Sequence, residues 1–554
     1  MTRFRAALRA RQPSPAGRRF LFVPYDQLTD AVGPLSREDP REIGIVLVES
    51  LGKARRRPYH RQKLALVLAN LRHFALEQAA RGVAVRHEVT EGSYADALAP
   101  LVAELGPLRV MEPAERELRV ELAPLLRKGA LEVLPHEGWL TTRAEFEALF
   151  PPGRGFRMDA FYRAVRARTG ILMDGDRPTG GRFSFDAENR KPWKGEPPAP
   201  EPPRFPMDPV KEEVCDLVAE RFAQHPGRLD PGALPATAAD AEALWAWARR
   251  ECLPSFGPFE DAMSTRSKGL FHTRISALLN LHRLLPARVV ADAERLAVPL
   301  QSREGFIRQV LGWREFVRHV HEATDGFRAL PDGSKPPVAT TPGDAGMARW
   351  SGRPFRAALP PRGLDGGAAP DFLGAGLPLP PAFWGRTSGL ACLDRVVADV
   401  FEEGFGHHIT RLMVLSNLAT LLGVVPRELT DWFWVAYTDA YDWVVEPNVL
   451  GMGTFALGPL FTTKPYVSGA AYLDRMSDYC AGCAFRPDVD CPVTPLYWAF
   501  LARNREKLAG NPRLAMPLRS LEKRSGARRR ADGETAERVT SLLARGETLV
   551  PGAG

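Results

Sequence analysis

The sequence predicts two kinds of architecture in one chain, a doubly wound parallel-sheet α/β domain followed by a helical region. Near the N-terminus, short apolar runs of strand length alternate with helical stretches, and strands that alternate with helices form a parallel sheet. From about residue 211 the spacing of apolar residues becomes helical. The length of 554 residues agrees with this division, because it allows two to four domains at roughly 100–200 residues each.

The composition excludes several classes of protein. Hydrophobic residues make up 45% and charged residues 25%, which rules out a wholly disordered, fibrous or collagen-like chain. The net charge of +8 is compatible with a nucleic-acid partner. Six cysteines are too few for a disulfide-stapled secreted scaffold, and no apolar run is long enough to span a bilayer. We therefore expect a cytoplasmic protein without a membrane partner, and a monomer.

Five apolar runs are expected to form the strands of the first domain, which we place at residues 19–140. They are Phe20–Val23, Ile43–Val48, Val83–Val89, Leu108–Met111 and Leu131–Leu134. Helices are expected between them, at Gln62–Gln78 and Tyr94–Leu105. Residues 24–28, which follow the first strand, read Pro-Tyr-Asp-Gln-Leu, so the GxGxxG fingerprint of NAD binding is absent.

The segments on either side of this domain are expected to pack poorly. Residues 1–18 are basic and lack the apolar core of a signal peptide. We interpret them as a disordered leader, with a weak transit peptide as the alternative. Residues 141–210 are expected to form a connector that ends in a proline-rich, extended stretch.

Helices are expected throughout residues 211–513, apart from a loop-rich insertion at 326–380 that is dense in Gly and Pro. Residues 514–554 are expected to be a basic tail with one short helix. The predicted helices are Ala238–Glu251, Leu270–Leu285, Val289–Leu296, Gly305–His321, Leu390–Glu403, His408–Gly423, Arg427–Asp442 and Val493–Leu508.

Four cysteines have the spacing of a metal site. Cys480 and Cys483 form a C-x2-C pair, Cys491 follows after seven intervening residues, and Cys392 lies upstream. Thiolates suit zinc or an iron–sulfur cluster. The spacing alone leaves three interpretations open, which are a cluster, a zinc site and no metal.

A histidine pair and a group of tryptophans are the other candidates. His407 and His408 lie at the start of a predicted helix, where a histidine is suited to donate a proton to a ligand. The alternative is a structural pair bonded to the backbone. Trp432, Trp434 and Trp443 follow, and they are ordinary core residues unless a redox cofactor lies within electron-transfer reach.

Six long stretches resemble one known family, the iron–sulfur-containing bacterial branch of the cryptochrome/photolyase family, which includes photolyase-related proteins and prokaryotic (6-4) photolyases. The stretches are 60–75, 157–191, 256–280, 306–318, 404–417 and 464–483. The resemblance implies an α/β antenna domain and an all-α C-terminal domain that binds FAD. It also implies light-driven DNA repair, in which reduced FAD transfers an electron to a flipped-out pyrimidine photoproduct in damaged DNA.

The resemblance assigns contacts to FAD. Arg411 and Asp439 match an ion pair against the flavin ring, where such a pair stabilises charge near N1. Arg314 belongs to a motif that lines the adenine and the lesion. The stretch that would hold the phosphates comprises His272, Thr273, Arg274, Ile275 and Ser276.

The resemblance also assigns catalytic roles. His408 falls where (6-4) enzymes place the histidine that protonates the lesion, and His407 precedes it as in this branch. Trp384 and Trp432 match aromatic residues credited with electron transfer to the flavin. Tyr472 matches a tyrosine beside the lesion pocket.

Two more cofactors are implied. The resemblance favours a [4Fe–4S] cluster on Cys392, Cys480, Cys483 and Cys491, and an antenna chromophore of the ribityllumazine type. Relatives often read Leu-Gly-Asp-Gln-Leu after the first strand, and residues 24–28 depart from this, which leaves the identity of the antenna ligand open.

Two departures concern the chemistry. Relatives carry an acidic residue near flavin N5 where this chain has Val445 followed by Glu446, so photoreduction is expected to differ. Animal-type (6-4) enzymes place a second histidine where this chain has Leu412. Three functions therefore remain: a (6-4) DNA photolyase, a blue-light receptor with the same cofactors, and a metal-bearing nucleic-acid-binding protein without photochemistry.

Overall fold

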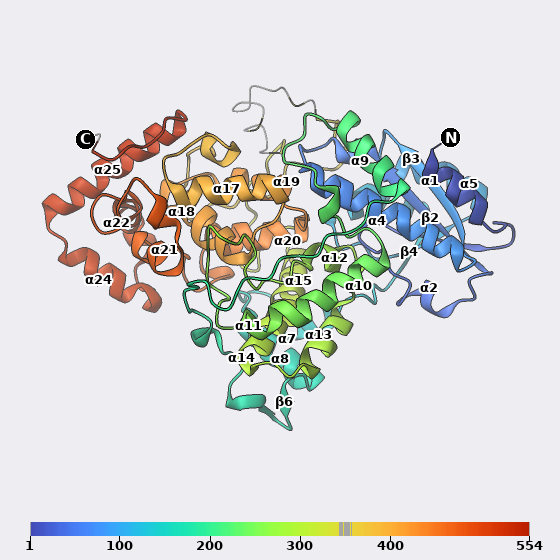
Figure 1. The fold of residues 1–554 in the computed structure, drawn as a ribbon, viewed down its shortest axis with the longest axis horizontal. Helices are drawn as coiled ribbons and strands as arrows, with labels where there is room; N and C mark the ends of the chain where they lie inside the picture. Colours follow the sequence, from blue (N-terminus) through green and yellow to red (C-terminus); the bar gives the residue numbers. More distant parts are fainter. Residues whose placement is uncertain (1, 343–346, 348–354, 356, 553–554) are drawn as a thin grey trace.

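The computed structural model describes residues 2–342, 347, 355 and 357–552. Figure 1 shows an α/β domain at one end of the molecule, coloured blue, and a helical region that fills the rest. The C-terminal helices, coloured red, lie at the opposite end from the sheet. In the described part of the chain, no helix has the length and apolar character needed to cross a membrane.

The sheet has five parallel strands in the order β3-β2-β1-β4-β5. The prediction of a doubly wound parallel sheet is confirmed, with every predicted strand present. The strands are β1 (Arg19–Phe22), β2 (Ile43–Ser50), β3 (Ala84–Thr90), β4 (Leu108–Met111) and β5 (Leu131–Leu134). The strand order reverses between β1 and β4, which makes their carboxyl ends the topological switch point of the sheet.

Apolar patterning explains why these residues form a two-sided layer. The inner strand β2 is buried along its whole length, as expected of a parallel strand covered on both faces. The covering helices are α4 (Arg61–Ala80), α5 (Tyr94–Leu105) and α6 (Arg116–Arg127). The capping box of Ser93 and Asp96 fixes the start of α5.

The N-terminal segment is folded, so the prediction of a disordered leader at residues 1–18 is wrong for its first half. Helix α1 (Arg3–Arg11) buries Phe4 and Leu8 against α4 and α9 (Pro209–Arg221). Two large apolar side chains four residues apart form a short stripe on one helix face, and that stripe is enough to hold the helix on the domain.

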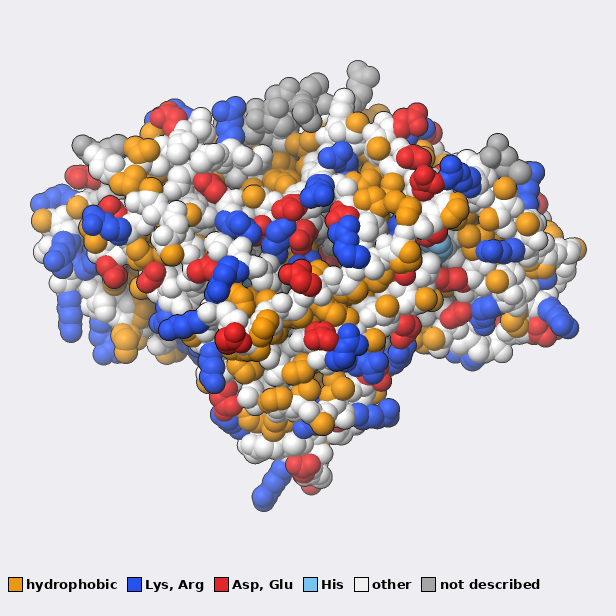
Figure 2. All heavy atoms as spheres, viewed as in Figure 1, with side chains coloured by type: hydrophobic (Ala, Val, Ile, Leu, Met, Phe, Trp, Pro, Cys, Tyr) orange, Lys and Arg blue, Asp and Glu red, His pale blue; other side chains and the backbone are white. Residues whose placement is uncertain are grey.

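The C-terminal tail also differs from the prediction of one short helix. It forms α24 (Ala515–Lys523) and the longer α25 (Gly526–Ala544), which packs against α22 (Val493–Arg503). Val539 and Leu543 are buried from α25. Figure 2 shows Lys and Arg side chains gathered over this left-hand end of the molecule, in agreement with the predicted basic character of the tail.

The connector at 141–210 contains more structure than expected. It includes α7 (Arg143–Leu149), α8 (Met158–Thr169) and a short hairpin of β6 (Met173–Asp174) and β7 (Arg177–Pro178). Phe205 is buried at its proline-rich end, so this stretch is not free of packing.

The helical region follows the predicted pattern with one clear error. Only α12 (Ser276–Asn280) is helical within the predicted helix Leu270–Leu285, because Leu270, Arg274 and His282 have positive φ angles that a helix does not accommodate. The other helices are α10 (Ala238–Trp247), α11 (Leu253–Phe256), α13 (Pro286–Arg295), α14 (Leu300–Ile307), α15 (Glu315–Ala323), α17 (Ala391–Glu403), α18 (Asn417–Leu422), α19 (Pro426–Ala436), α20 (Asp442–Glu446), α21 (Ala470–Met476) and α23 (Arg505–Leu508).

The predicted insertion at 326–380 is described over residues 326–342 and 357–380, and at two isolated positions. The two longer parts contain single bridges, Val338 to Ala368 and Leu377 to Val424, and neither a helix nor a strand. The loop-rich prediction agrees with them. For residues 343–346, 348–354 and 356 it lies outside the described part of the chain.

Candidate functional site

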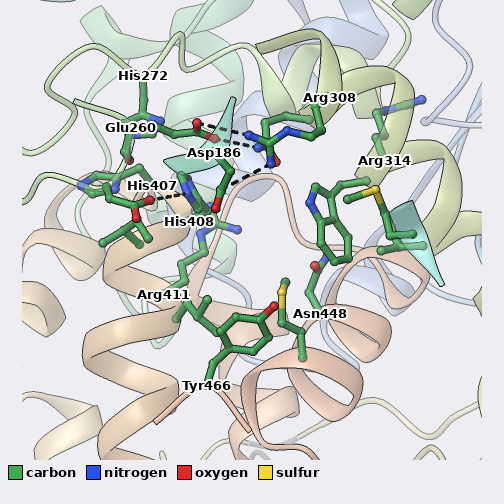
Figure 3. Close-up of a pocket in the computed structure, with 18 of the residues that line it drawn as sticks. Asp186, Glu260, His272, Arg308, Arg314, His407, His408, Arg411, Asn448 and Tyr466 are labelled. Atoms are coloured by element: carbon green, nitrogen blue, oxygen red, sulfur yellow. Dashed lines mark hydrogen bonds and ion pairs between the residues drawn. The ribbon is translucent and has the colours of Figure 1, made fainter. Parts of the chain in front are cut away.

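A cavity of about 1080 Å³ lies within the helical region. Its lining comes from α8, from the loop before α12, and from three π-helical stretches. The stretches are η5 (Arg308–Arg314), η8 (Thr410–Ser416) and η9 (Pro447–Gly453). π-Helical turns recur at functional sites in proteins, and here they place Arg314, Arg411 and Asn448 around one space (Figure 3).

The predicted phosphate-binding stretch lines this cavity. Arg274 has a φ of 56°, its guanidinium Nη1 donates to Glu403 Oε2 over 2.8 Å, and it lies 4.2 Å above the Phe405 ring. A left-handed conformation at a non-glycine residue costs about 1–3 kcal/mol and is typical of functional sites. The strained turn brings the whole stretch to the cavity wall, namely His272, Thr273, Arg274, Ile275 and Ser276.

The predicted pair of Arg411 and Asp439 is an ion pair in the structure. Arg411 Nη2 donates to both carboxylate oxygens of Asp439 over 3.0 Å. Ser276 Oγ donates to Asp439 Oδ2 over 2.7 Å, and Asn280 Nδ2 donates to the Asp439 carbonyl over 2.8 Å. The Arg411 guanidinium also lies 3.9 Å from the centroid of the Tyr437 ring. The pair is therefore fixed from several sides before any ligand arrives.

Three histidines meet at one side of the cavity (Figure 3). The rings of His272 and His407 stack with centroids 4.4 Å apart and an angle of 5°. Burial lowers the pKa of both well below the usual value, and the neighbouring histidines lower it further. His408 differs, because its side chain is 40% exposed and its Nε2 lies 3.7 Å from Asp261 Oδ1. His408 is thus the member of the group that faces both the cavity and a carboxylate.

His272 lines the cavity with the rest of the predicted stretch, and its side chain has a second setting. Its Nε2 donates to the Glu260 carbonyl over 3.2 Å, and its ring supports His407. The ring is therefore placed to position His407.

The histidine group is not arranged for a metal ion. The ligand atoms of His272, His407 and His408 lie within 4.8 Å of one another. A metal ion binds in the plane of each imidazole ring, along the nitrogen lone pair. The rings of His272 and His407 are nearly parallel, so one ion cannot lie in both planes.

A basic group adds charge to the cavity lining. Arg190, Lys464 and Arg513 line the cavity, and burial lowers the pKa of Lys464, helped by the charges of Arg513 and Arg190. These residues, and Asp261, were not singled out from the sequence. For Arg190, Asp261 and Lys464 the available signal was their place in the stretches 157–191, 256–280 and 464–483 that carry the family resemblance, and Arg513 lies outside all of these stretches. The predicted residues Tyr472 and Arg314 also line the cavity.

Among the predicted tryptophans, Trp443 lines the cavity, whereas Trp384 and Trp432 lie outside it on an aromatic path toward it. The Trp384 ring stacks on Phe401 at 6.3 Å, and Phe401 lies 6.2 Å from Trp432. Trp432 is fully buried and lies 6.0 Å from Tyr437, which contacts Arg411. A series of neighbouring aromatic rings therefore leads from the half-buried Trp384 to Arg411 at the cavity wall.

The acidic residue beside Val445 does not replace the missing carboxylate. Val445 lines the cavity, whereas Glu446 is buried elsewhere. Glu446 pairs with Arg427 over 2.7 Å and with His321 over 2.8 Å, and these partners help to hold its pKa down to about 2 against the effect of burial. The polar residue available on this wall is Asn448.

The structure brings the four cysteines of the predicted metal site together. Cys392 lies in α17, and Cys480 lies in the short helix η11 (Tyr479–Gly482), which packs against α17. Burial is the largest cause of the raised pKa of Cys392, and the neighbouring thiols of Cys491, Cys480 and Cys483 raise it further.

Comparison with known proteins agrees with this architecture. Residues 21–233 match the model of the deoxyribodipyrimidine photo-lyase-related protein family. The chain is 33% identical over 515 residues to a (6-4) photolyase of Agrobacterium fabrum, which covers 89% of this chain and 93% of the relative.

Two solved structures share the fold. The crystal structure of a bacterial class III photolyase from Agrobacterium tumefaciens matches with a TM-score of 0.50 at 13% identity, over 96% of this chain and 99% of that one. A cryptochrome from Synechocystis matches with a TM-score of 0.52 at 15% identity, over 94% and 99%. The identity to the Agrobacterium fabrum relative, over nearly all of both chains, shows that this protein belongs to the photolyase-related branch of the cryptochrome/photolyase family.

Proposed function

We propose that this protein is a light-driven DNA photolyase that repairs (6-4) photoproducts with FAD as its cofactor. The observation that carries the proposal is one cavity lined by both the fixed pair of Arg411 and Asp439 and the half-exposed His408. The first is suited to a flavin and the second to protonating a lesion. The 33% identity to a (6-4) photolyase supports the choice of lesion.

The residues around the cavity fit FAD. Its volume of about 1080 Å³ suits a large cofactor, and two buried polar atoms beside it, His407 Nδ1 and Tyr437 Oη, have no partner among the described residues. Arg411 and Asp439 would hold the flavin ring, and Thr273 and Ser276 would meet the phosphates. Bound there, reduced FAD supplies blue-light absorption and the electron that the lesion accepts.

His408 is the proposed proton donor. A histidine has an unperturbed pKa close to neutral pH, so it can carry a proton before the lesion needs one and regain it afterwards. The Asp261 carboxylate lies 3.7 Å from His408 Nε2 and is placed to orient the ring. His407 remains neutral because it is buried, so it orients its neighbour while His408 supplies the proton.

Damaged DNA is the proposed partner. Arg190, Lys464 and Arg513 provide positive charge at the cavity. Burial lowers the pKa of Lys464, and repulsion from Arg513 and Arg190 lowers it further. Phosphate groups would relieve this repulsion, and phosphate contacts give nucleic-acid binding most of its affinity. A flipped-out base would then enter the cavity toward Tyr472 and His408.

We further propose that Cys392, Cys480, Cys483 and Cys491 hold a [4Fe–4S] cluster. The proximity of the four thiols, of which Cys491, Cys480 and Cys483 add to the burial that raises the pKa of Cys392, supports a shared metal centre, and the family resemblance favours the cluster over zinc. The cluster would tie η11 and the segment before α22 to α17.

A blue-light receptor with the same cofactors is the second candidate. The path from Trp384 through Phe401 and Trp432 would deliver electrons to the flavin in either function. Two features favour repair, namely the exposed proton donor and the basic lining of the cavity.

The test is repair of defined lesions under blue light. The purified protein should convert oligonucleotides that carry a single (6-4) photoproduct to undamaged DNA, in light and not in darkness. An oligonucleotide with a cyclobutane dimer serves as the comparison. Light-dependent repair of the cyclobutane dimer alone, or of neither lesion by protein that retains flavin, would refute the proposal.

A further inference from the structure

The α/β domain has a second place where this fold binds ligands. In doubly wound sheets, ligands bind in the crevice outside the carboxyl ends of the strands where the strand order reverses. Here the reversal falls between β1 and β4. The loop Val23–Leu28 leaves β1 at this point, and Glu115 follows β4. An antenna chromophore, as expected from the family resemblance, would use this crevice.

Side chains of the protein occupy the crevice. The Tyr25 ring, 4% exposed, stacks against Tyr441 with centroids 6.2 Å apart and an angle of 17°. Its other neighbour is Tyr94, at 5.9 Å. The Lys53 ammonium lies 5.3 Å from the Tyr25 centroid. Because Tyr441 belongs to the helical region, the crevice is closed from both domains.

Polar contacts hold this filling in place. Lys53 Nζ donates to Glu115 Oε2 over 2.5 Å, and Gln27 Nε2 donates to the Met111 carbonyl over 3.1 Å. The Asp26 carbonyl accepts a hydrogen bond of 2.6 Å from His282 Nδ1, across the domain boundary. The Gln27 contact ties the loop after β1 to β4, and the His282 contact ties the same loop to the helical region. The Lys53 contact ties α3 (Leu51–Ala54) to the segment after β4.

The flavin cavity provides a comparison within the same molecule. That cavity is open space of about 1080 Å³. The crevice of the α/β domain is instead filled by buried side chains, each at most 9% exposed, namely Tyr25, Lys53, Tyr94, Glu115 and Tyr441. Relatives often carry glycine at the position of Tyr25, as noted above. A glycine leaves the space beside the strand end free for a flat ligand, and the tyrosine ring takes that space itself.

We propose that this α/β domain binds no antenna chromophore, because Tyr25 and Lys53 fill its ligand crevice, and that the flavin alone collects the light. The proposal goes beyond the repair function and does not depend on it. It replaces the ribityllumazine-type antenna that the resemblance suggested.

Three buried polar atoms in the crevice have no partner among the described residues, namely Tyr25 Oη, Asp26 Oδ1 and Tyr441 Oη. Buried water satisfies such groups in protein interiors, and each water needs only the volume of one small probe sphere. Burial also raises the pKa of Asp26 to about 7, which allows its carboxyl group to act as a donor near neutral pH. Small waters meet these needs, so a ring-sized ligand is not required.

The test is a chromophore count on the whole protein. The protein is produced in cells that make ribityllumazine, its chromophores are released by denaturation, and each is measured by chromatography and mass spectrometry relative to flavin. We expect flavin and less than about a tenth as much of any other chromophore. A second chromophore in a ratio near one to one with flavin would overturn the proposal. The count is independent of repair, so a protein without photolyase activity still gives a clear answer.

Two variants test the cause. Tyr25→Gly opens the crevice, and Tyr25→Phe keeps it filled as the matched control. With ribityllumazine as the probe in a fluorescence titration, we expect Tyr25→Gly to bind at least about tenfold more tightly than the wild type, and Tyr25→Phe to match the wild type. If Tyr25→Gly retains flavin and melts cooperatively yet does not gain binding, the role of Tyr25 is refuted. If it does not fold, the wild-type chromophore count decides.

Discussion

At the scale of single residues, three histidines of one group have three different tasks. His272 is fixed by the Glu260 carbonyl, His407 is stacked on it, and His408 alone is well exposed. Burial removes the charge from the first two. The division matters because a proton donor must reach both the ligand and the solvent that recharges it.

The residue scale also gives a prediction about flavin retention. Asp439→Ala removes the partner of Arg411 and the acceptor of Ser276 Oγ, and leaves a guanidinium unpaired beside the cavity. We expect the flavin content per protein to fall at least about tenfold, because a buried unpaired charge costs about 3–5 kcal/mol. Chromatographic flavin measurement checks this. Ser276→Ala is the milder control, since it removes one neutral donor, and equal flavin content in Asp439→Ala and wild type would contradict the expectation.

A second residue-scale prediction concerns electron transfer. Trp432 is buried between Phe401 and Tyr437, and its Nε1 donates to the Phe383 carbonyl over 2.7 Å. Trp432→Phe keeps an aromatic core residue but removes the easily oxidised indole. We expect photoreduction of the bound flavin to slow at least about tenfold with flavin content unchanged, as followed by absorption under blue light with a reductant. Trp245→Phe, at a buried tryptophan outside this path, is the control.

At the scale of elements, the four cysteines lie where α17 meets the segment from η11 to α22. Cys480, Cys483 and Cys491 are half-buried, while Cys392 is buried in α17. The proposed cluster would add a covalent link to the apolar packing between these elements.

The corresponding prediction is a loss of iron with a loss of folding. Cys480→Ser should reduce the iron per protein from about four to near zero and lower the soluble yield, because cluster binding and folding are coupled. Iron and zinc are measured by elemental analysis on protein prepared without oxygen. Cys215→Ser, at a cysteine in α9, is the matched control. Zinc in place of iron in the wild type would contradict the cluster.

Local sequence patterns predicted most elements, and the exceptions have physical causes. The strands could be predicted because each is a short apolar run that neighbouring residues alone are enough to identify. The turn at Arg274 and the π-helical stretches could not be predicted in this way. Packing imposes the φ of 56° at Arg274 and the wider turns of the π-helical stretches, and neither leaves a period in the sequence. The prediction of a disordered leader was wrong because two apolar residues, Phe4 and Leu8, are too few to form a recognisable helical pattern in a basic segment.

The candidate site was predictable only in part for the same reason. The pair of Arg411 and Asp439 lies 28 residues apart in the chain, and no spacing rule joins them, so the family resemblance was needed. Asp261 lies within the stretch 256–280, but no local pattern marks it as a functional residue. Its meaning appears only when the fold brings it 3.7 Å from His408.

At the scale of the whole molecule, buried histidines connect the α/β domain to the helical region. His60 Nε2 donates to the Phe401 carbonyl over 3.1 Å, and its backbone N–H donates to the Val435 carbonyl over 2.7 Å. His282, in the helical region, donates to the Asp26 carbonyl in the α/β domain. Burial lowers the pKa of His60 to about 4 and that of His282 to about 3.

These shifts predict acid sensitivity of the domain interface. The ordinary pKa of 6.5 applies to the unfolded chain, so below that pH the unfolded state takes up protons that the folded state excludes. The stability is therefore fully present above about pH 6.5 and falls as the pH decreases toward 4, by about 3 kcal/mol for His60 alone. Melting temperatures between pH 7 and pH 4 check this. His60→Asn should melt lower at pH 7 but decline less with acid, and an unchanged decline would contradict the assignment.

The most direct measurement of the central claim is the light-driven repair of a (6-4) photoproduct by His408→Ala, with flavin content and melting temperature recorded on the same sample. General acid catalysis contributes about 10²–10⁴-fold. We predict that repair falls by at least about 100-fold while flavin content, flavin photoreduction and melting temperature stay close to wild type, because the His408 side chain is 40% exposed and its contact with Asp261 spans 3.7 Å. Full (6-4) repair by His408→Ala would contradict the account, as would a loss of flavin and stability that matches the loss of repair.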